Sequence, residues 1–360
     1  MIVKMACSTN NLLIKDLDTT YMIFKFTSKY EYFEKDFLTE GVLKAIGQVS
    51  VESYKNNSYF LAETNFQSEK ENELTKNDTS LLGVNIQAYY AYLQNFIQYL
   101  WFVKDNCCGI NSFHAFMPEA KRTIIKTNPN AYSTCSGSLT DQIEFTIAEL
   151  DKVAKIYVHC NNILPNKILK KLQPGEVKPD DILPRKINPI DYKNTNRVQR
   201  AMHFLNMARS TNILPAKIAL YMCVYECLFS GTDKVEIIHQ IAERTALYLG
   251  SYIDSRFSIY DLIKEGYGVR SSYYHGKRIK ENRDKLLEIS KRIDALTRAL
   301  FSKVFFDDYK VFTQENESIL QLSFKELLFR DRESSVLSVT VGESKPEYLL
   351  FSDGGGGGFF

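Results

Sequence analysis

Over about the first 80 residues, hydrophobic and polar side chains alternate in short stretches. Two examples are TYMIFKFT at 20–27 and GQVSVESY at 47–54, both rich in β-branched and aromatic residues. Because successive side chains of a strand point to opposite faces, this period of two predicts strands. The polar stretch SEKENELTKNDTS at 68–80 predicts an exposed loop after them.

From about residue 83 the hydrophobic positions recur at spacings of three and four, which is typical of a helix with one buried face. These positions are Tyr89, Leu93, Phe96, Ile97 and Leu100. A second stretch of this kind, FTIAELDKVAKIYVHC, covers 145–160. We therefore predict that the region 1–161 mixes strands and helices.

Prolines cluster in the middle of the chain, where five of the nine fall within 162–196. Since proline fixes φ and lacks an N–H donor, this segment is predicted to be a linker and the boundary between two domains. From 197 to 330 the pattern is almost entirely helical, and four helices joined by short turns predict an antiparallel bundle. The segment 331–360 contains five consecutive glycines and predicts a tail with a flexible end. The fold class is therefore predicted to be α+β.

Composition excludes several functions and favours one compartment. The chain has 45 Lys and Arg against 43 Asp and Glu, so binding to nucleic acid would require a local basic patch. The seven cysteines contain no C-x-x-C pair, which favours a reducing cytoplasm, buried thiols and no metal. Nucleotide-binding and hydrolase motifs are missing, so we expect no cofactor. The apolar stretch 87–103 contains too many amides to span a membrane, and we expect no membrane partner.

The stretch GVRSSYYHGKR at 268–278 carries the strongest candidate chemistry. Histidine exchanges protons near neutral pH, and the forked donors of arginine suit a phosphate. Arg270 and His275 together supply a base and an anion stabiliser. That pair is sufficient to cleave RNA without a metal, through attack of the 2′-OH on the neighbouring phosphorus.

The five-residue spacing of this pair does not fit one face of a helix. Five residues turn an ideal helix by about 500°, which leaves the two side chains roughly 140° apart. Either the helix is distorted, or a two-fold dimer brings the groups of two chains together. Gly276 is placed to end the helix as the residue after its C-cap, with His275 at its C-terminus.

The surroundings of the pair carry both functional and ordinary interpretations. Tyr274 fits stacking on RNA bases, and Lys277 and Arg278 fit a phosphate backbone, but tyrosines are usually core residues and basic residues often follow helices. Glu226 lies on an otherwise apolar helix and requires a partner, for which Arg270 and Arg244 are the candidates. His239 and Glu243 lie one turn apart and either support the cleft or form a surface pair.

The helical region resembles the HEPN superfamily, specifically the Apea-like HEPN domains, over about residues 197–310. The closing signature of that family resembles Y-x-x-R-S-x-x-x-H-G. The positions of this chain that match it are Tyr267, Arg270, Ser271, His275 and Gly276. Two earlier helices match as E-x-L, with Glu226 and Leu228, and as A-x-R-x-A, with Ala242, Arg244 and Ala246.

The resemblance implies a metal-independent endoribonuclease that dimerises around a shared cleft, in a bacterial toxin or phage-defence setting. Arg270 would bind phosphate, His275 would transfer the proton, and Ser271 fits the polar residue that often follows the arginine. Single-stranded RNA would be cut to 2′,3′-cyclic phosphate and 5′-OH ends, while the region 1–161 senses, regulates or docks a protein partner. The alternative is an inactive HEPN module that binds RNA, a nucleotide or a protein.

Overall fold

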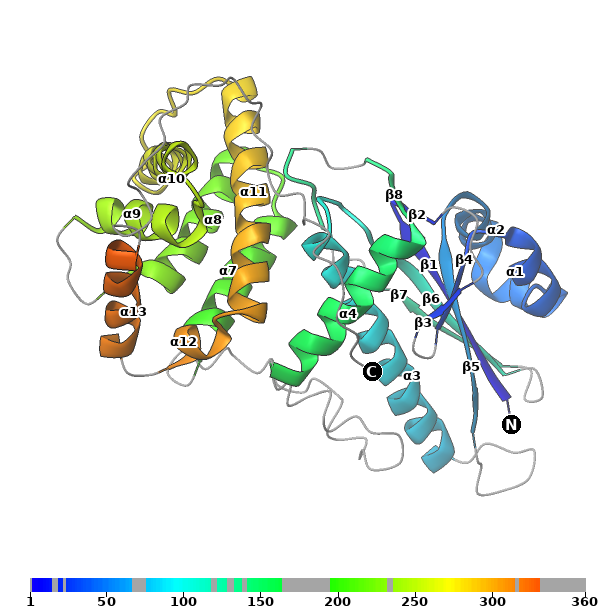
Figure 1. Ribbon diagram of the computed structural model, residues 1–360. Helices are drawn as coiled ribbons and strands as arrows, with labels where there is room; N and C mark the ends of the chain where they lie inside the picture. Colours follow the sequence, from blue (N-terminus) through cyan, green and yellow to red (C-terminus); the bar gives the residue numbers. More distant parts are fainter. Residues whose placement is uncertain are drawn as a thin grey trace.

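The computed structural model describes residues 2–14, 19–21, 24–66, 76–117, 122–127, 133–137, 141–163, 195–231, 236–314 and 317–330. Most of the predicted linker and the whole predicted tail lie outside these residues. The described residues form an antiparallel sheet with helices on both faces, followed by a helical bundle (Figure 1). The predicted α+β class is confirmed. None of the helices described is long and apolar enough to cross a membrane.

Six antiparallel strands make the main sheet, in the order β3-β4-β5-β1-β6-β7. Their bounds are β1 Ile2–Asn10, β3 Thr19–Tyr21, β4 Phe24–Thr27, β5 Tyr59–Asn65, β6 Gly109–Met117 and β7 Arg122–Thr127. A separate parallel pair joins β2 (Leu12–Ile14) to β8 (Ile143–Phe145). The predicted strand at 20–27 is confirmed as the hairpin β3–β4, within the residues described there.

The central strand β1 is buried on both faces because each face is covered by helices. Val3 and Met5 belong to the main core, on the side of α3 (Lys76–Tyr99) and α4 (Ile147–Ile163). Ala6 points to the other face and a smaller core. That smaller core is covered by α1 (Tyr30–Asp36) and α2 (Glu40–Asn56). The helices predicted after residue 83 and over 145–160 are therefore confirmed.

The prediction of a strand at 47–54 is wrong, because these residues lie in α2. Gly47 has φ 77° and kinks the helix, and Val49 is 87% exposed. The buried residues of α2 are Val42, Ile46, Val51 and Tyr54. Their spacing is helical, and the alternation around Val51 reflected a helix that changes direction at a glycine. The predicted loop at 68–80 is also wrong in its last part, where α3 begins at residue 76.

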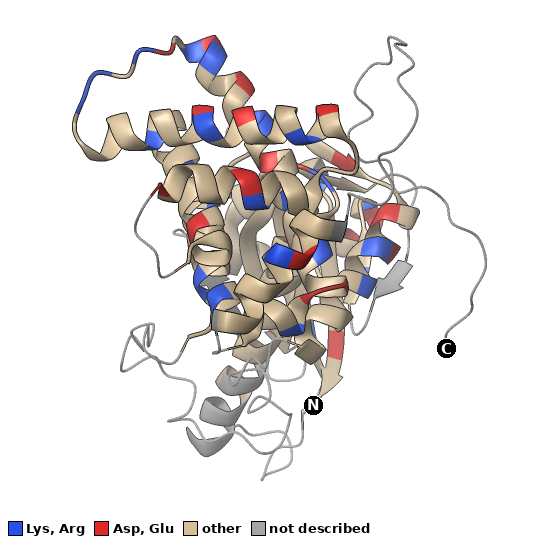
Figure 2. Cartoon of the chain, turned by 60° about the vertical axis from the view of Figure 1, so that its left-hand side comes forward, with Lys and Arg blue, Asp and Glu red and all other residues tan. Residues whose placement is uncertain are grey.

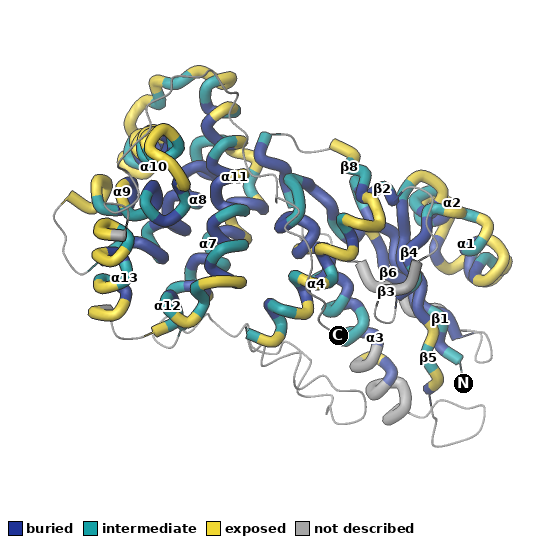
Figure 3. The backbone as a smooth tube through the Cα atoms, viewed as in Figure 1, coloured by how far each residue is buried: buried dark blue, intermediate teal, exposed yellow. Residues whose placement is uncertain are grey.

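The bundle is built around one apolar helix, α8 (Leu214–Phe229), which packs against α7, α9, α10 and α11. Figure 3 shows the buried residues where these helices face one another and the exposed ones on the outer turns. The helices are α7 Arg197–Ser210, α9 Ile237–Leu249, α10 Ile253–Tyr274, α11 Arg283–Phe306, α12 Tyr309–Thr313 and α13 Glu317–Arg330.

One hydrophobic core runs through the sheet region and the bundle. A short 3-10 helix, Leu100–Phe102, follows α3 and inserts Trp101 against α11. Trp101 Nε1 donates a hydrogen bond to Asp294 Oδ1 over 2.8 Å, and both residues are 1% exposed. The ring of Phe102 packs edge-on against Phe301, and His159 of α4 stacks on Phe306. The two regions are thus joined by buried contacts of Trp101 and Phe102 and by the partly exposed stack of His159 on Phe306.

Candidate active site at the end of helix α10

Helix α10 ends in a Schellman motif that fixes the position of His275. Lys277 N–H donates to Ser272 C=O at 2.8 Å, and Gly276 N–H donates to Tyr273 C=O at 3.2 Å. Gly276 has φ 63°, the left-handed conformation that glycine adopts without steric cost. His275 is the C-cap residue and is exposed. The prediction that Gly276 follows the C-cap is confirmed.

Arg270 is held against α8 by the carboxylate of Glu226. Arg270 Nη2 lies 2.9 Å from Glu226 Oε1, and the side chains are 30% and 26% exposed. Tyr267 OH donates to the same Oε1 at 2.8 Å. Of the two predicted partners for Glu226, the structure selects Arg270. Arg244 instead donates to Phe229 C=O and to Gln321 Oε1.

Two tyrosines flank the Arg270 guanidinium. Its Cζ lies 5.2 Å from the ring centroid of Tyr274 and 5.8 Å from that of Tyr267, within the range of cation–π attraction. Burial raises the pKa of Tyr274 to about 12, and burial together with the Glu226 carboxylate raises the pKa of Tyr267 above its usual range. Both hydroxyls therefore stay protonated at neutral pH and serve as donors. Arg270 Nε is buried and has no hydrogen-bond partner among the residues described.

Arg270 and His275 do not meet within one chain. Arg270 faces α8, whereas the side chain of His275 makes no hydrogen bond or ion pair in the described part of the chain. The angle of roughly 140° between the two side chains stays a prediction from their five-residue spacing. Ser271 is half-buried beside Arg270, and its C=O accepts the His275 N–H at 3.1 Å.

The other predicted site residues divide into two groups. Lys277 and Arg278 are exposed on the loop between α10 and α11, where Figure 2 shows Lys and Arg gathered at the edge of the bundle. His239 and Glu243 lie on α9, away from this loop. His239 Nδ1 is 2.6 Å from Tyr260 OH, which lies 15 residues and therefore about 22 Å before His275 along α10. The structure does not bring His239 or Glu243 to the arginine.

Cys223 was missed from the sequence, and Tyr267 was matched to the family signature without a predicted role. Cys223 Sγ lies 3.9 Å from Tyr274 OH. Tyr267, Arg270 and Tyr274 follow one another at spacings of three and four, so the helical period alone would place them on one face. Cys223 and Glu226 share a face of α8 for the same reason. In the part of the chain that the structure describes, no group of three or more His, Cys, Asp or Glu side chains is arranged to hold a metal.

Comparison with protein-family models, with curated proteins and with solved structures found no match to this chain.

Proposed function

We propose that this chain is a metal-independent endoribonuclease of the HEPN type that cuts single-stranded RNA. The observation that supports this most is the environment of Arg270, which Glu226 and Tyr267 orient beside the partly exposed ring of Tyr274. A guanidinium held in this way, five residues before an exposed histidine, offers a phosphate-binding group and a proton-transfer group at the same end of a helix. The exposed Lys277 and Arg278 add positive charge for the RNA backbone.

The reaction follows from the chemistry of these two side chains. His275 accepts the proton of the 2′-OH, and the 2′-oxygen forms a bond to the adjacent phosphorus. Arg270 stabilises the charge that develops on the phosphoryl oxygens. The bond from phosphorus to the 5′-oxygen breaks, and this oxygen takes the proton that His275 accepted in the first step. The products are a 2′,3′-cyclic phosphate and a 5′-OH.

A homodimer supplies what one chain lacks. Since an ideal helix places residues 270 and 275 roughly 140° apart, a two-fold partner placed at the ends of α10 would contribute the complementary arginine or histidine. Exposed rings already lie there, because Tyr273 is 39% and Tyr274 is 51% exposed. In this proposal the enzyme acts in the cytoplasm in a bacterial toxin or phage-defence setting, and the sheet region senses a signal or docks a protein partner.

The test is RNA cleavage by the full chain with a chelator present. We expect cutting that leaves 5′-OH ends, is lost in His275→Ala and is blocked by a 2′-deoxy residue at the cleavage site. His239→Ala is the matched control, since it removes an exposed histidine about 22 Å away along α10 and should retain activity within about twofold. Equal cleavage by His275→Ala and the wild type would exclude this function.

One observation favours a second function, an inactive HEPN module that binds RNA, a nucleotide or a protein. Arg270 is already engaged by Glu226 and two tyrosines, an arrangement that also serves a purely structural or interface role. In that case no RNA is cut under any condition, while Arg270→Ala abolishes binding or dimerisation. Size-exclusion chromatography of Arg270→Ala beside the cleavage assay separates the two functions.

A further inference from the structure

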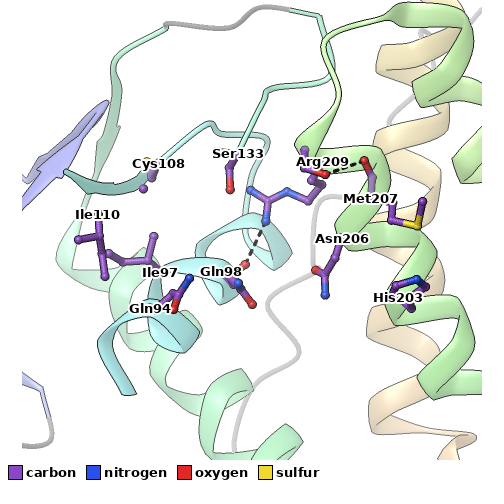
Figure 4. A pocket seen from close by; sticks show the side chains of 12 residues that line it. Gln94, Ile97, Gln98, Cys108, Ile110, Ser133, His203, Asn206, Met207 and Arg209 are labelled. Carbon is purple, nitrogen blue, oxygen red and sulfur yellow. Dashed lines mark hydrogen bonds between the residues drawn. The ribbon is translucent and has the colours of Figure 1, made fainter. Parts of the chain in front are cut away.

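A pocket lies between the sheet region and the bundle, and all of its lining residues precede α10 in the sequence. We call it the junction pocket; its volume is about 290 Å³. It is formed by α3, by the start of β6, by Ser133 and by α7 (Figure 4). Gln98 and Asn206 are exposed at its mouth, and Ile97 and Cys108 are buried in its wall. Both regions of the molecule therefore contribute to one cavity.

Arg209 gives the junction pocket a buried positive charge. Its side chain is 5% exposed, and Figure 4 shows it reaching from α7 towards Gln98 of α3. Its Nη atoms donate to the carbonyl oxygens of Gln98, at 3.4 Å, and of Asn106, at 3.2 Å. No carboxylate lies within ion-pair distance of it among the residues described, and Nε has no hydrogen-bond partner there.

A second buried cation lies next to this one. Lys217 is 1% exposed and donates from Nζ to Thr134 Oγ1 at 2.6 Å and to Ala208 C=O at 2.9 Å. Burial lowers the pKa of Lys217 to about 8. It likewise has no carboxylate at ion-pair distance within the described parts of the chain. Thr134, which accepts from Lys217, follows the pocket residue Ser133 in the chain. Lys217 therefore lies one residue removed from the lining of the pocket.

The carboxylates nearest these cations are occupied by other groups. Asp294 pairs with Arg298 at 2.7 Å and also accepts from Trp101 and Tyr221. Asp105 accepts hydrogen bonds from the backbone and hydroxyl of Ser136. None of the described residues that line the junction pocket is Asp or Glu. Asp294 and Asp105 act electrostatically on Arg209 and Lys217, but they also face Arg298, so three positive side chains stand against two carboxylates. Because a buried charge is costly unless it is compensated, an anion in the pocket would supply the remaining negative charge.

The remaining polar groups of the pocket suit an organic ligand. Gln94, Gln98 and Asn206 each present an amide donor and acceptor, and Ser133 adds a hydroxyl. Each Nη of Arg209 has a second N–H besides the one that it donates to a backbone carbonyl, and these can bind phosphate oxygens, while amides pair with the edge of a base. A volume of 290 Å³ lies at the small end of ligand sites. We propose that the junction pocket binds a small phosphate-bearing molecule of about the size of a nucleoside monophosphate.

Thermal unfolding of the full chain tests this binding without any reference to RNA cleavage. The probes are AMP, GMP, CMP and UMP, with inorganic phosphate and citrate as comparators at matched ionic strength. At least one nucleotide is expected to raise the melting temperature by about 2–4 °C. Because Arg209 contacts buried backbone, its replacement risks misfolding, so the blocking variant is Asn206→Trp at the exposed mouth. Its matched control is Asn162→Trp, at an exposed position of α4 outside the pocket.

The expected result is a shift in the wild type and in Asn162→Trp that is lost in Asn206→Trp. Three results would overturn the proposal. These are no shift with any of the four nucleotides, an undiminished shift in Asn206→Trp, or a shift with citrate or inorganic phosphate alone as large as that with the nucleotides.

Discussion

At the scale of single residues, Glu226 determines where the Arg270 guanidinium points. It is the acceptor shared by Arg270 and Tyr267, and it reaches them from a different helix. The sequence predicted an ion pair for Glu226, because a carboxylate on an apolar helix needs a partner, but left two arginines open. Only the packing of α8 against α10 distinguishes them, since it brings residues 226 and 270 together and leaves Arg244 on the far side, near α13.

The first prediction concerns the positioning role of Glu226. Glu226→Gln keeps an acceptor for Tyr267 but removes the charge that holds Arg270. We expect the kcat of RNA cleavage to fall about 10- to 100-fold with little change in KM, because the guanidinium loses its alignment. The free energy of unfolding should change by no more than about 1 kcal/mol, since the pair is partly solvated.

Glu265→Gln is the matched control, because Glu265 pairs with Lys285 on the exposed side of α10. It should leave both kcat and stability nearly unchanged. A Glu226→Gln enzyme with wild-type kcat would show that the ion pair serves stability or nothing at all.

At the scale of elements, the sequence predicted helices and strands correctly where their hydrophobic period was unbroken or their end residues were distinctive. The end of α10 was predictable because Gly276 is a residue that tolerates positive φ, and the helices around it have clear hydrophobic periods. Helix α2 was mistaken for a strand because a kink at Gly47 breaks its period. The order of the sheet strands was not predictable, since β1 pairs with β5 and β6, about 50 to 110 residues further along the chain.

The second prediction compares two glycines, Gly268 inside α10 and Gly276 just after its C-cap. Gly276→Ala should lower the free energy of unfolding by about 1 kcal/mol, because alanine resists the left-handed conformation with φ 63°. Gly268→Ala should raise it by up to about 1 kcal/mol, because its Cβ would meet no atom within 4 Å and alanine favours helix. Urea unfolding of both variants measures this. Equal changes of the same sign would mean that α10 ends differently in solution.

The third prediction concerns the packing of α2 on the sheet. Tyr54 OH of α2 lies 2.7 Å from His114 Nδ1 of β6, and His114 is 1% exposed. Burial lowers the pKa of His114 to about 4. In the unfolded chain His114 takes up a proton near pH 6.5, whereas in the folded chain it does so only near pH 4. The free energy of unfolding therefore falls as the pH drops from 6.5 towards 4. Between pH 7 and 5 we expect a loss of about 2 kcal/mol from this residue.

Urea unfolding at pH 7, 6 and 5 tests this sign and size. His114→Asn, which keeps an acceptor near the position of Nδ1, should show a smaller loss over this range. An identical slope in His114→Asn would assign the pH dependence to other groups.

At the scale of the whole molecule, the fourth prediction tests whether two chains form one site. Arg270→Ala and His275→Ala should each be inactive alone. Mixed in equal amounts and allowed to exchange, they should recover about a quarter of wild-type cleavage, because half of the dimers are mixed and each contains one complete arginine–histidine pair. No recovery, in mixtures shown by native mass spectrometry to exchange, would place the complete site within a single chain.

The contact between Trp101 and Asp294 also has a consequence in time. The two residues are 193 positions apart in the chain. A ribosome that adds about 5–20 residues per second therefore produces the indole roughly 10–40 s before its carboxylate partner. Until then the side chain of Trp101 lacks the contacts with α11 that bury it in the complete molecule. A nascent chain therefore cannot complete the bundle before α11 has been synthesised. A chain truncated before α11 never completes it.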